Sequence, residues 1–276
     1  MNPPPPDPLS LLSPGAPEAA GQWTRLPYGD GPRFSASDLP LHWDRLHVGQ
    51  GLPAPAQGPL AEGWAHYHSG EFEVAAAIGL AHAPEGLALA NQATAIYANY
   101  LEPRESVRLA LFKQVAERAT AQLANEPDNC QALYWQAYAL GRYSQGISVA
   151  RALAQGLGTK VKGALERVIE LRPQHADAHV ALAAFHAEVI DKVGSLVGRM
   201  TYGVRADTAV ELFERGMQLN PLSASAAIEY ARGLLMLHGD TRMAEATRLY
   251  EKAAHLDPAD ARERLDVELA RAGMTD

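Results

Sequence analysis

The chain has 276 residues, a hydrophobic content of 47% and a formal net charge of −8 at pH 7. Because nucleic-acid binding normally requires a basic face, this acidic balance argues against a nucleic-acid partner. The single cysteine, Cys130, excludes an internal disulfide and a zinc site built from several cysteines. It also suits a reducing compartment, so we expect a cytoplasmic location.

The N-terminal region is rich in proline, with thirteen of the 19 prolines among the first 60 residues. Proline removes a backbone donor and disfavours helix before it, so residues 1–59 are predicted to be an extended or disordered segment. Asp38 is placed to cap one short helix carrying Trp43. The aromatic residues Trp23, Tyr28, Phe34 and Trp43 leave a second interpretation open, in which the segment docks on the rest of the chain.

From residue 60 onward the sequence is rich in alanine and has the apolar spacing of helices, so residues 60–276 are predicted to form one helical domain. The expected helices are 60–69, 71–83, 86–101, 105–125, 129–154, 160–171, 176–193, 207–219, 223–238, 242–256 and 260–272. No secretory signal is visible at the N-terminus, and no continuous apolar run reaches the length of about 18 residues that a membrane span needs. We therefore expect no membrane partner.

Three of these helices end in the same way, with leucine, a polar residue and proline at 171–173, 219–221 and 256–258. A small residue follows ten positions after the proline, Ala183 after Pro173 and Ala231 after Pro221. Pro127 is a fourth anchor, with Ala137 ten positions later. This repetition predicts an all-α solenoid of stacked antiparallel hairpins, which bury a core only against their neighbours.

The distances between the proline anchors are 46, 48 and 37 residues, against about 34 in the common tetratricopeptide repeat. The extra residues fall within 142–159 and 188–205. In both places we expect the first helix of the hairpin to run long and an irregular loop to follow it. The final segment, 261–271, mixes apolar and charged residues and is predicted to be a C-terminal capping helix with a charged outer face.

The segments ALYWQAYALGRYSQ at 132–145, ALERVIELRP at 164–173 and AVELFERGMQLNP at 209–221 resemble tetratricopeptide-repeat (TPR) proteins. The long insert between the last two is similar to bacterial relatives of the regulator-of-microtubule-dynamics family. The resemblance implies a TPR-like α-solenoid with lengthened hairpins that binds other proteins and has no catalytic constellation. It transfers no functional residue to this chain, and microtubule binding is not carried over.

In such an array the first helices of the hairpins line a concave groove. Tyrosine and arginine, which are favoured at protein interfaces, occur on these helices. The groove is predicted to contain Gln131, Tyr134, Tyr138, Arg142, Asp177, Val180, Ala184, Glu188, Ser225, Ile228 and Arg232. Two interpretations remain open for this surface: a solvated inner face without ligand preference, and a groove for a peptide or partner helix.

The leading hypothesis is a non-enzymatic scaffold that binds a protein or peptide segment, without cofactor, metal or catalytic residues. One alternative is a small-molecule carrier whose pocket is closed by the two inserts. A weaker alternative is a metal-dependent enzyme, because His175, His179 and His186 can share one helix face. No cysteine or carboxylate completes that site at convincing spacing, and core packing explains these histidines better. Cys130 lies at the start of a helix, where the dipole favours a lower thiol pKa, but no partnering base is identifiable, and we interpret it as an ordinary, partly buried thiol.

Overall fold

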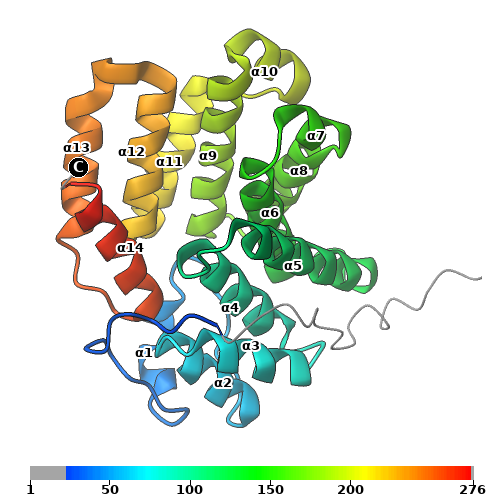
Figure 1. The fold of residues 1–276 in the computed structure, drawn as a ribbon, viewed down its shortest axis with the longest axis vertical. Coiled ribbons are helices and arrows are strands. Elements are labelled where there is room, and N and C mark those ends of the chain that lie inside the picture. The colour runs from blue at the N-terminus through cyan, green and yellow to red at the C-terminus, as the bar shows by residue number, and fades with distance from the viewer. Residues whose placement is uncertain (1–22, 275–276) are drawn as a thin grey trace, which may run out of the picture.

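The computed structural model describes residues 23–274, which form helices and turns without a β-strand (Figure 1). The all-α prediction is therefore confirmed. The N-terminal helices of the chain pack against one another in sequence order, α2 on α3, α3 on α4 and α4 on α5. They are α1 (Leu39–Leu46), α2 (Pro59–His68), α3 (Phe72–Ala81), α4 (Leu87–Tyr100) and α5 (Glu105–Asn125).

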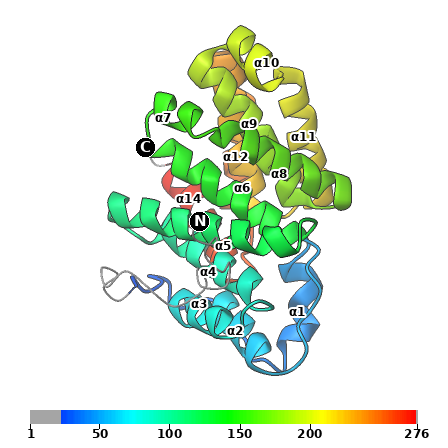
Figure 2. The same cartoon turned by 90° about the vertical axis from the view of Figure 1, so that its right-hand side faces the viewer.

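The rest of the array consists of three hairpins, α6 with α8, α9 with α11 and α12 with α13 (Figure 2). Their helices are α6 (Cys130–Gln145), α8 (Leu157–Leu171), α9 (Ala176–Val193), α11 (Ala206–Leu219), α12 (Ala224–His238) and α13 (Met243–Ala254). A short 3-10 turn, η2 (Gly239–Arg242), joins the last two. The proline anchors thus separate successive hairpins, as the repeat spacing predicts.

The two inserts are folded, which differs from the irregular loops expected there. The predicted helix 129–154 is interrupted at 146–148, and a separate helix α7 (Val149–Ala154) follows, with the Ser148 side chain accepting a hydrogen bond from the Arg151 backbone N–H. The second insert contains α10 (Ser195–Tyr202), which packs on α9. Local features explain the difference, because the Ser148 side chain caps α7 and the positive φ of +83° at Gly194 separates α9 from α10.

Small residues lie where the helices approach most closely. Ala137, Ala183 and Ala231 are fully or almost fully buried, as expected. A Cβ added at Gly216 would lie 2.5 Å from a methyl carbon of Val180, so α11 and α9 are in direct contact at this glycine. Packing at this distance leaves no room for a larger side chain.

The N-terminal segment is docked on the helical body over residues 23–58. Trp43 of α1 is buried and its indole Nε1 donates a hydrogen bond to the Leu52 carbonyl at 2.6 Å. Trp23 stacks on Tyr97 of α4 with ring centroids 4.0 Å apart. This part of the segment is therefore not extended throughout and matches the docked interpretation. Residues 1–22 lie outside the described residues, and the domain division near residue 60 stays a prediction.

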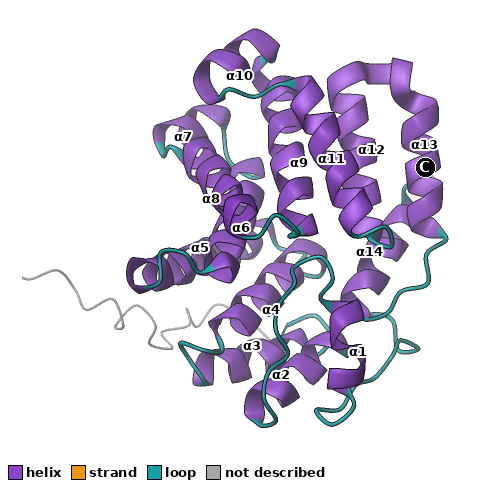
Figure 3. Ribbon diagram, turned by 180° about the vertical axis from the view of Figure 1, so that it is seen from behind, coloured by secondary structure: helices purple, strands orange, loops and turns teal. Residues whose placement is uncertain are grey.

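The C-terminal helix α14 (Ala261–Ala272) ends the array and lies between the last hairpin and the region of α1 and α2 (Figure 3). Its side chains do not form a simple charged outer face. Leu265 joins the main core, and Asp266 is buried and accepts a hydrogen bond from Tyr100 of α4. None of the helices within residues 23–274 has the length and apolar character needed to cross a membrane.

Candidate functional site

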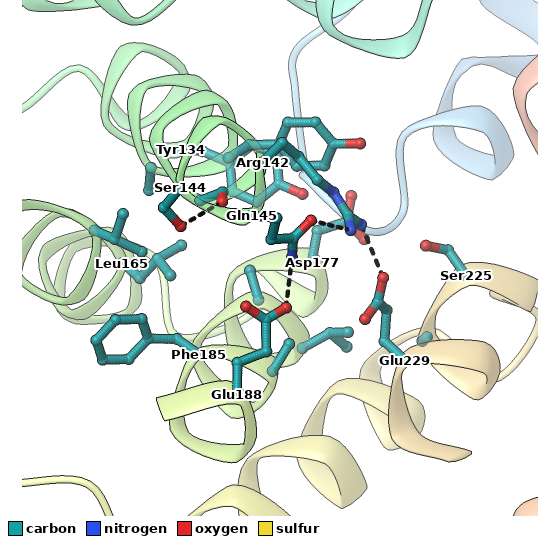
Figure 4. Close-up of a pocket in the computed structure, with 18 of the residues that line it drawn as sticks. Tyr134, Arg142, Ser144, Gln145, Leu165, Asp177, Phe185, Glu188, Ser225 and Glu229 are labelled. Carbon is teal, nitrogen blue, oxygen red and sulfur yellow. Dashed lines mark hydrogen bonds and ion pairs between the residues drawn. The ribbon is translucent and has the colours of Figure 1, made fainter. Parts of the chain in front are cut away.

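A cavity of about 120 Å³ lies between α6, α8, α9 and α12 (Figure 4). Most of the predicted groove residues line it, namely Tyr134, Tyr138, Arg142, Asp177, Val180, Ala184, Glu188 and Ser225. They come from the first helices of the three hairpins, as the repeat spacing indicates. The cavity is comparable in size to one of about 150 Å³ that holds a benzene ring.

Three predicted groove residues lie elsewhere. Gln131 is buried at the start of α6, where its side-chain oxygen accepts a hydrogen bond from Trp135 at 3.3 Å. Ile228 is buried in the apolar cluster that α12 forms with α13 and α14. Arg232 donates to the Tyr250 hydroxyl of α13 at 3.2 Å. Gln131 lies in the first turn of α6, Ile228 faces α13 and α14, and Arg232 contacts α13 of its own hairpin. These residues therefore occupy packing positions instead of the cavity wall.

Helix α6 supplies the aromatic wall of the cavity. Asn129 caps this helix by accepting a hydrogen bond from the Ala132 N–H at 3.0 Å. From that start, Tyr134, Tyr138 and Arg142 follow at intervals of four and therefore share one face. The Arg142 guanidinium carbon lies 5.4 Å from the centre of the Tyr138 ring, a favourable cation–π position.

An ion pair spans the cavity from α6 to α12. Arg142 donates to a carboxylate oxygen of Glu229 at 2.8 Å, and both side chains are largely buried. Burial alone would lower the pKa of Arg142, but the Glu229 carboxylate raises that pKa above its ordinary value. Burial would raise the pKa of Glu229, but Arg142 holds it below its ordinary value. Both groups are therefore ionised at neutral pH, and the pair fixes the spacing of the two helices.

Gln145 and Glu188 form the second polar feature of the cavity. The Gln145 amide donates to Glu188 at 2.5 Å, while its oxygen lies 3.4 Å from Arg142 (Figure 4). Burial raises the pKa of the Glu188 carboxyl, because the opposing charges of Lys192 and Arg142 offset only part of its desolvation. Glu188 is thus a carboxylate with spare acceptor capacity facing the cavity.

Arg262 of α14 also lines the cavity, although it is distant in sequence from the repeat helices. The nearest carboxylate oxygens, those of Asp177 and Asp266, are 3.7 and 4.0 Å away. Its Nε is buried and has no hydrogen-bond partner among the described residues. Burial raises the pKa of Asp266 to about 6 against the opposing charge of Arg262. Sequence reasoning missed Arg262 because a terminal capping helix gives no signal that it reaches the groove.

Helix α8 provides the floor of the cavity, which the sequence did not predict. Leu157, Val161 and Leu165 contribute apolar surface, and Phe185 of α9 faces them (Figure 4). Gly156, which precedes α8, has a left-handed backbone with φ of +63°, and the turn between the helices is confined to 155–156, because 157–160 belong to α8.

The three histidines considered for a metal site are buried and engaged with the backbone. His175 caps α9 by accepting a hydrogen bond from the Ala178 N–H, and His179 donates to the His175 carbonyl. The His186 ring contacts the backbone of Arg205. No cluster of three or more histidine, cysteine or acidic side chains suited to a metal ion occurs within residues 23–274.

Cys130 is a buried thiol at the first position of α6. The helix dipole was expected to favour the thiolate if the residue were reactive. Burial instead raises the pKa of Cys130, so desolvation outweighs the dipole and the neighbouring arginines. This environment is typical of a structural cysteine.

The arrangement of hairpins has a counterpart among solved structures. A crystal structure of a thermophilic TPR protein from Thermus thermophilus superposes with a TM-score of 0.54, covering 78% of this chain and 97% of that chain at 18% sequence identity. The fold is TPR-like. No protein-family profile and no curated protein matches the sequence. The resemblance to the regulator-of-microtubule-dynamics family stays a prediction.

Proposed function

We propose that this TPR-like protein is a non-enzymatic scaffold that binds a segment of another protein on its concave face. The observation that carries the proposal is the cavity between α6, α8, α9 and α12, which combines an apolar floor with buried polar groups. Its volume suits one large side chain instead of a whole helix. The partner segment would lie across the groove and insert a single anchoring side chain.

The chemistry of the cavity favours an apolar or aromatic anchor with a polar end. Leu165, Val161 and Phe185 supply the apolar surface, and the tyrosines of α6 can stack on a ring. Glu188 and the unbonded Nε of Arg262 offer an acceptor and a donor to the polar end. The Arg142–Glu229 ion pair fixes the distance between α6 and α12 before binding. Few additional side chains therefore need to become ordered when the partner binds.

A panel of random peptides displayed on phage tests this function even though the partner is unidentified. Ala184 lines the cavity, so Ala184→Phe fills it, whereas Ala244 of α13 is exposed and Ala244→Phe is a matched control. Peptides enriched on the wild type should lose about tenfold or more in affinity on Ala184→Phe and keep it on the control. Absence of enrichment, or equal binding to both variants, would contradict the proposal.

A small-molecule carrier is the second candidate, because a cavity of about 120 Å³ also accepts a compact ring compound. Only parts of the inserts reach it: Arg142, Ser144, Gln145, Leu157 and Gly158 from the first insert, and Glu188 from the second. Helix α10 does not line the cavity, so the pocket is not closed by both inserts as that hypothesis assumed. A thermal-shift screen of metabolites separates the candidates, since a carrier shows a saturable shift that Ala184→Phe removes.

We place this binding activity in the cytoplasm, because the single cysteine is a buried free thiol, which suits a reducing compartment. Expression of a fluorescent fusion followed by cell fractionation checks the location.

A further inference from the structure

The two inserts carry a charge opposite to that of the whole chain. Residues 143–163 and 192–205, which overlap the inserts at 142–159 and 188–205, contain the cations Arg151, Lys160, Lys162, Lys192, Arg199 and Arg205 and no aspartate or glutamate. The rest of the two inserts adds Arg142, Glu188 and Asp191, so the inserts as a whole keep an excess of positive charge. The chain as a whole has a net charge of −8. Lys162 pairs with Glu166, and Lys192 lies 3.8 Å from Glu188. The other four cations are exposed, and none of them has an ion pair with a described residue.

The same inserts expose large apolar side chains. Leu196 and Met200 of α10 are 72% and 80% exposed, and Val197 beside them is 52% exposed. These residues lie on one side of the helix, while the buried Gly198 lies on the other side, against Val204 and Val189. Helix α10 is thus amphipathic, with its apolar stripe directed away from the protein body.

Helix α7 repeats this pattern one hairpin earlier. Val149 and Leu153 are four residues apart on one face, and both are exposed. The two helices lie at the same end of the molecule, opposite α1, α2 and α3 (Figures 1 and 3). A direct contact links the inserts, because a Cβ added to Gly158 after α7 would meet the Tyr202 ring at the end of α10. We call the exposed side chains of α7 and α10, together with their unpaired cations, the basic apolar end.

We propose that the basic apolar end docks this protein on an anionic lipid surface. Arginine and lysine beside exposed aliphatic side chains on short amphipathic helices suit the membrane interface, where cations meet lipid headgroups and apolar side chains enter the acyl boundary. The expectation of no membrane partner followed from the lack of a spanning run. A peripheral contact depends instead on the local charge, which here is positive.

The shape of this surface favours lipid over an acidic protein. Helices α7 and α10 contain 6 and 8 residues, and their apolar side chains project from them in two small groups. A stable protein interface normally buries more than about 1,000 Å² with close shape complementarity, which two such short helices do not offer alone. A fluid bilayer adapts to projecting side chains and supplies a continuous layer of negative charge.

Vesicle sedimentation tests the proposal with the full-length protein. The wild type should bind phosphatidylcholine vesicles that contain phosphatidylserine about tenfold or more tightly than vesicles of phosphatidylcholine alone, and added salt should weaken this binding. The double variant Leu196→Ser/Met200→Ser should lose about tenfold or more, as should Arg199→Glu/Arg205→Glu. Leu41 of α1 is 84% exposed at the other end of the molecule, so Leu41→Ser is the matched control and should bind like the wild type.

Equal binding of the wild type to both kinds of vesicle, or full binding by Leu196→Ser/Met200→Ser, would overturn the proposal. Binding to polyglutamate without binding to anionic vesicles would overturn it in favour of an acidic protein partner. Circular dichroism of each variant confirms that it is folded. Because the basic apolar end is separate from the cavity, Ala184→Phe should bind vesicles normally even if it abolishes peptide binding.

Discussion

His68 Nδ1 lies 2.6 Å from Asp260 Oδ2, so this hydrogen bond joins α2 to the start of α14 across 192 positions of the chain. The other ring nitrogen of His68 lies 3.0 Å from His47 Nε2, and Asp260 also caps α14 by accepting from the Glu263 N–H. All three side chains in this chain of contacts, His47, His68 and Asp260, are buried. The N-terminal segment, helix α2 and the terminal helix α14 are therefore held together at one point.

Removing the Asp260 carboxylate should destabilise the protein strongly. Asp260→Ala removes both the helix cap and the partner of His68, and we expect a loss of about 3–5 kcal/mol in the free energy of unfolding. Asp260→Asn keeps an oxygen that can accept from the Glu263 N–H, so its loss should be smaller. Urea unfolding measures both variants. Equal stability of Asp260→Ala and the wild type would show that this contact does not hold the termini of the array.

Stability should fall as the pH decreases from about 6.5 toward 4. Burial lowers the pKa of His175 to about 4, whereas an unfolded histidine titrates near 6.5. Over this window the unfolded chain binds a proton that the folded protein does not, so the unfolding free energy decreases by up to about 1.4 kcal/mol per pH unit for this group. Burial also lowers the pKa of His47, which contributes with the same sign.

The variant His175→Asn isolates the contribution of this histidine. Asparagine can still accept the hydrogen bond that caps α9, but it does not titrate. Its unfolding free energy should therefore depend less on pH between 4 and 6.5 than that of the wild type, as measured by denaturant titrations at several pH values. His255→Asn, at an exposed position, serves as the control. An unchanged slope in His175→Asn would refute the assignment.

Replacing glycine with alanine should change the stability of the protein in opposite directions at two helical positions. A Cβ at Gly233 of α12 would lie 2.4 Å from the buried Phe213 ring, so Gly233→Ala should cost about 1–3 kcal/mol. At the exposed Gly163 of α8 nothing lies within 4 Å of an added Cβ, so Gly163→Ala should stabilise by about 0.5–1 kcal/mol. Differential scanning calorimetry should show melting shifts of opposite sign, and a stabilising Gly233→Ala would contradict the close contact of α11 with α12.

The N-terminal segment should contribute to the stability of the array. Trp43 is buried against Trp64, with ring centroids 5.5 Å apart, and Trp43→Ala removes this packing and the hydrogen bond to Leu52. We expect a loss of about 3–5 kcal/mol, the usual range for a buried tryptophan. Thermal unfolding followed by circular dichroism checks the value. A melting temperature equal to that of the wild type would mean that α1 does not pack stably on α2.

The helical repeat was predictable because its constraints are local and recur. The proline anchors and the alanines at 137, 183 and 231 report contacts between helices that are near in sequence. The same spacing placed Tyr134, Tyr138 and Arg142 on one face of α6, which is why they were identified as groove residues. A periodic sequence pattern therefore predicts which residues of neighbouring repeat helices form the walls of the cavity.

The remaining features depend on contacts between residues far apart in the chain. Arg262 reaches the cavity because α14 folds back, and the bond between His68 and Asp260 exists only once the ends of the array meet. Neither of these two contacts produces a periodic pattern in the sequence. The inserts were located by their length, but their short helices begin at a local cap, Ser148, and at a glycine with a positive φ, Gly194. Sequence spacing therefore indicated where extra residues lie without indicating their structure.

A crystal structure with a peptide enriched from the random library tests the central claim most directly. We predict that one side chain of the peptide enters the cavity beside Tyr138, Leu165 and Phe185, with its polar end near Glu188 or Arg262. The peptide backbone should lie along α6, α9 and α12. A peptide bound on the outer helices, with the cavity left unfilled, would contradict the account.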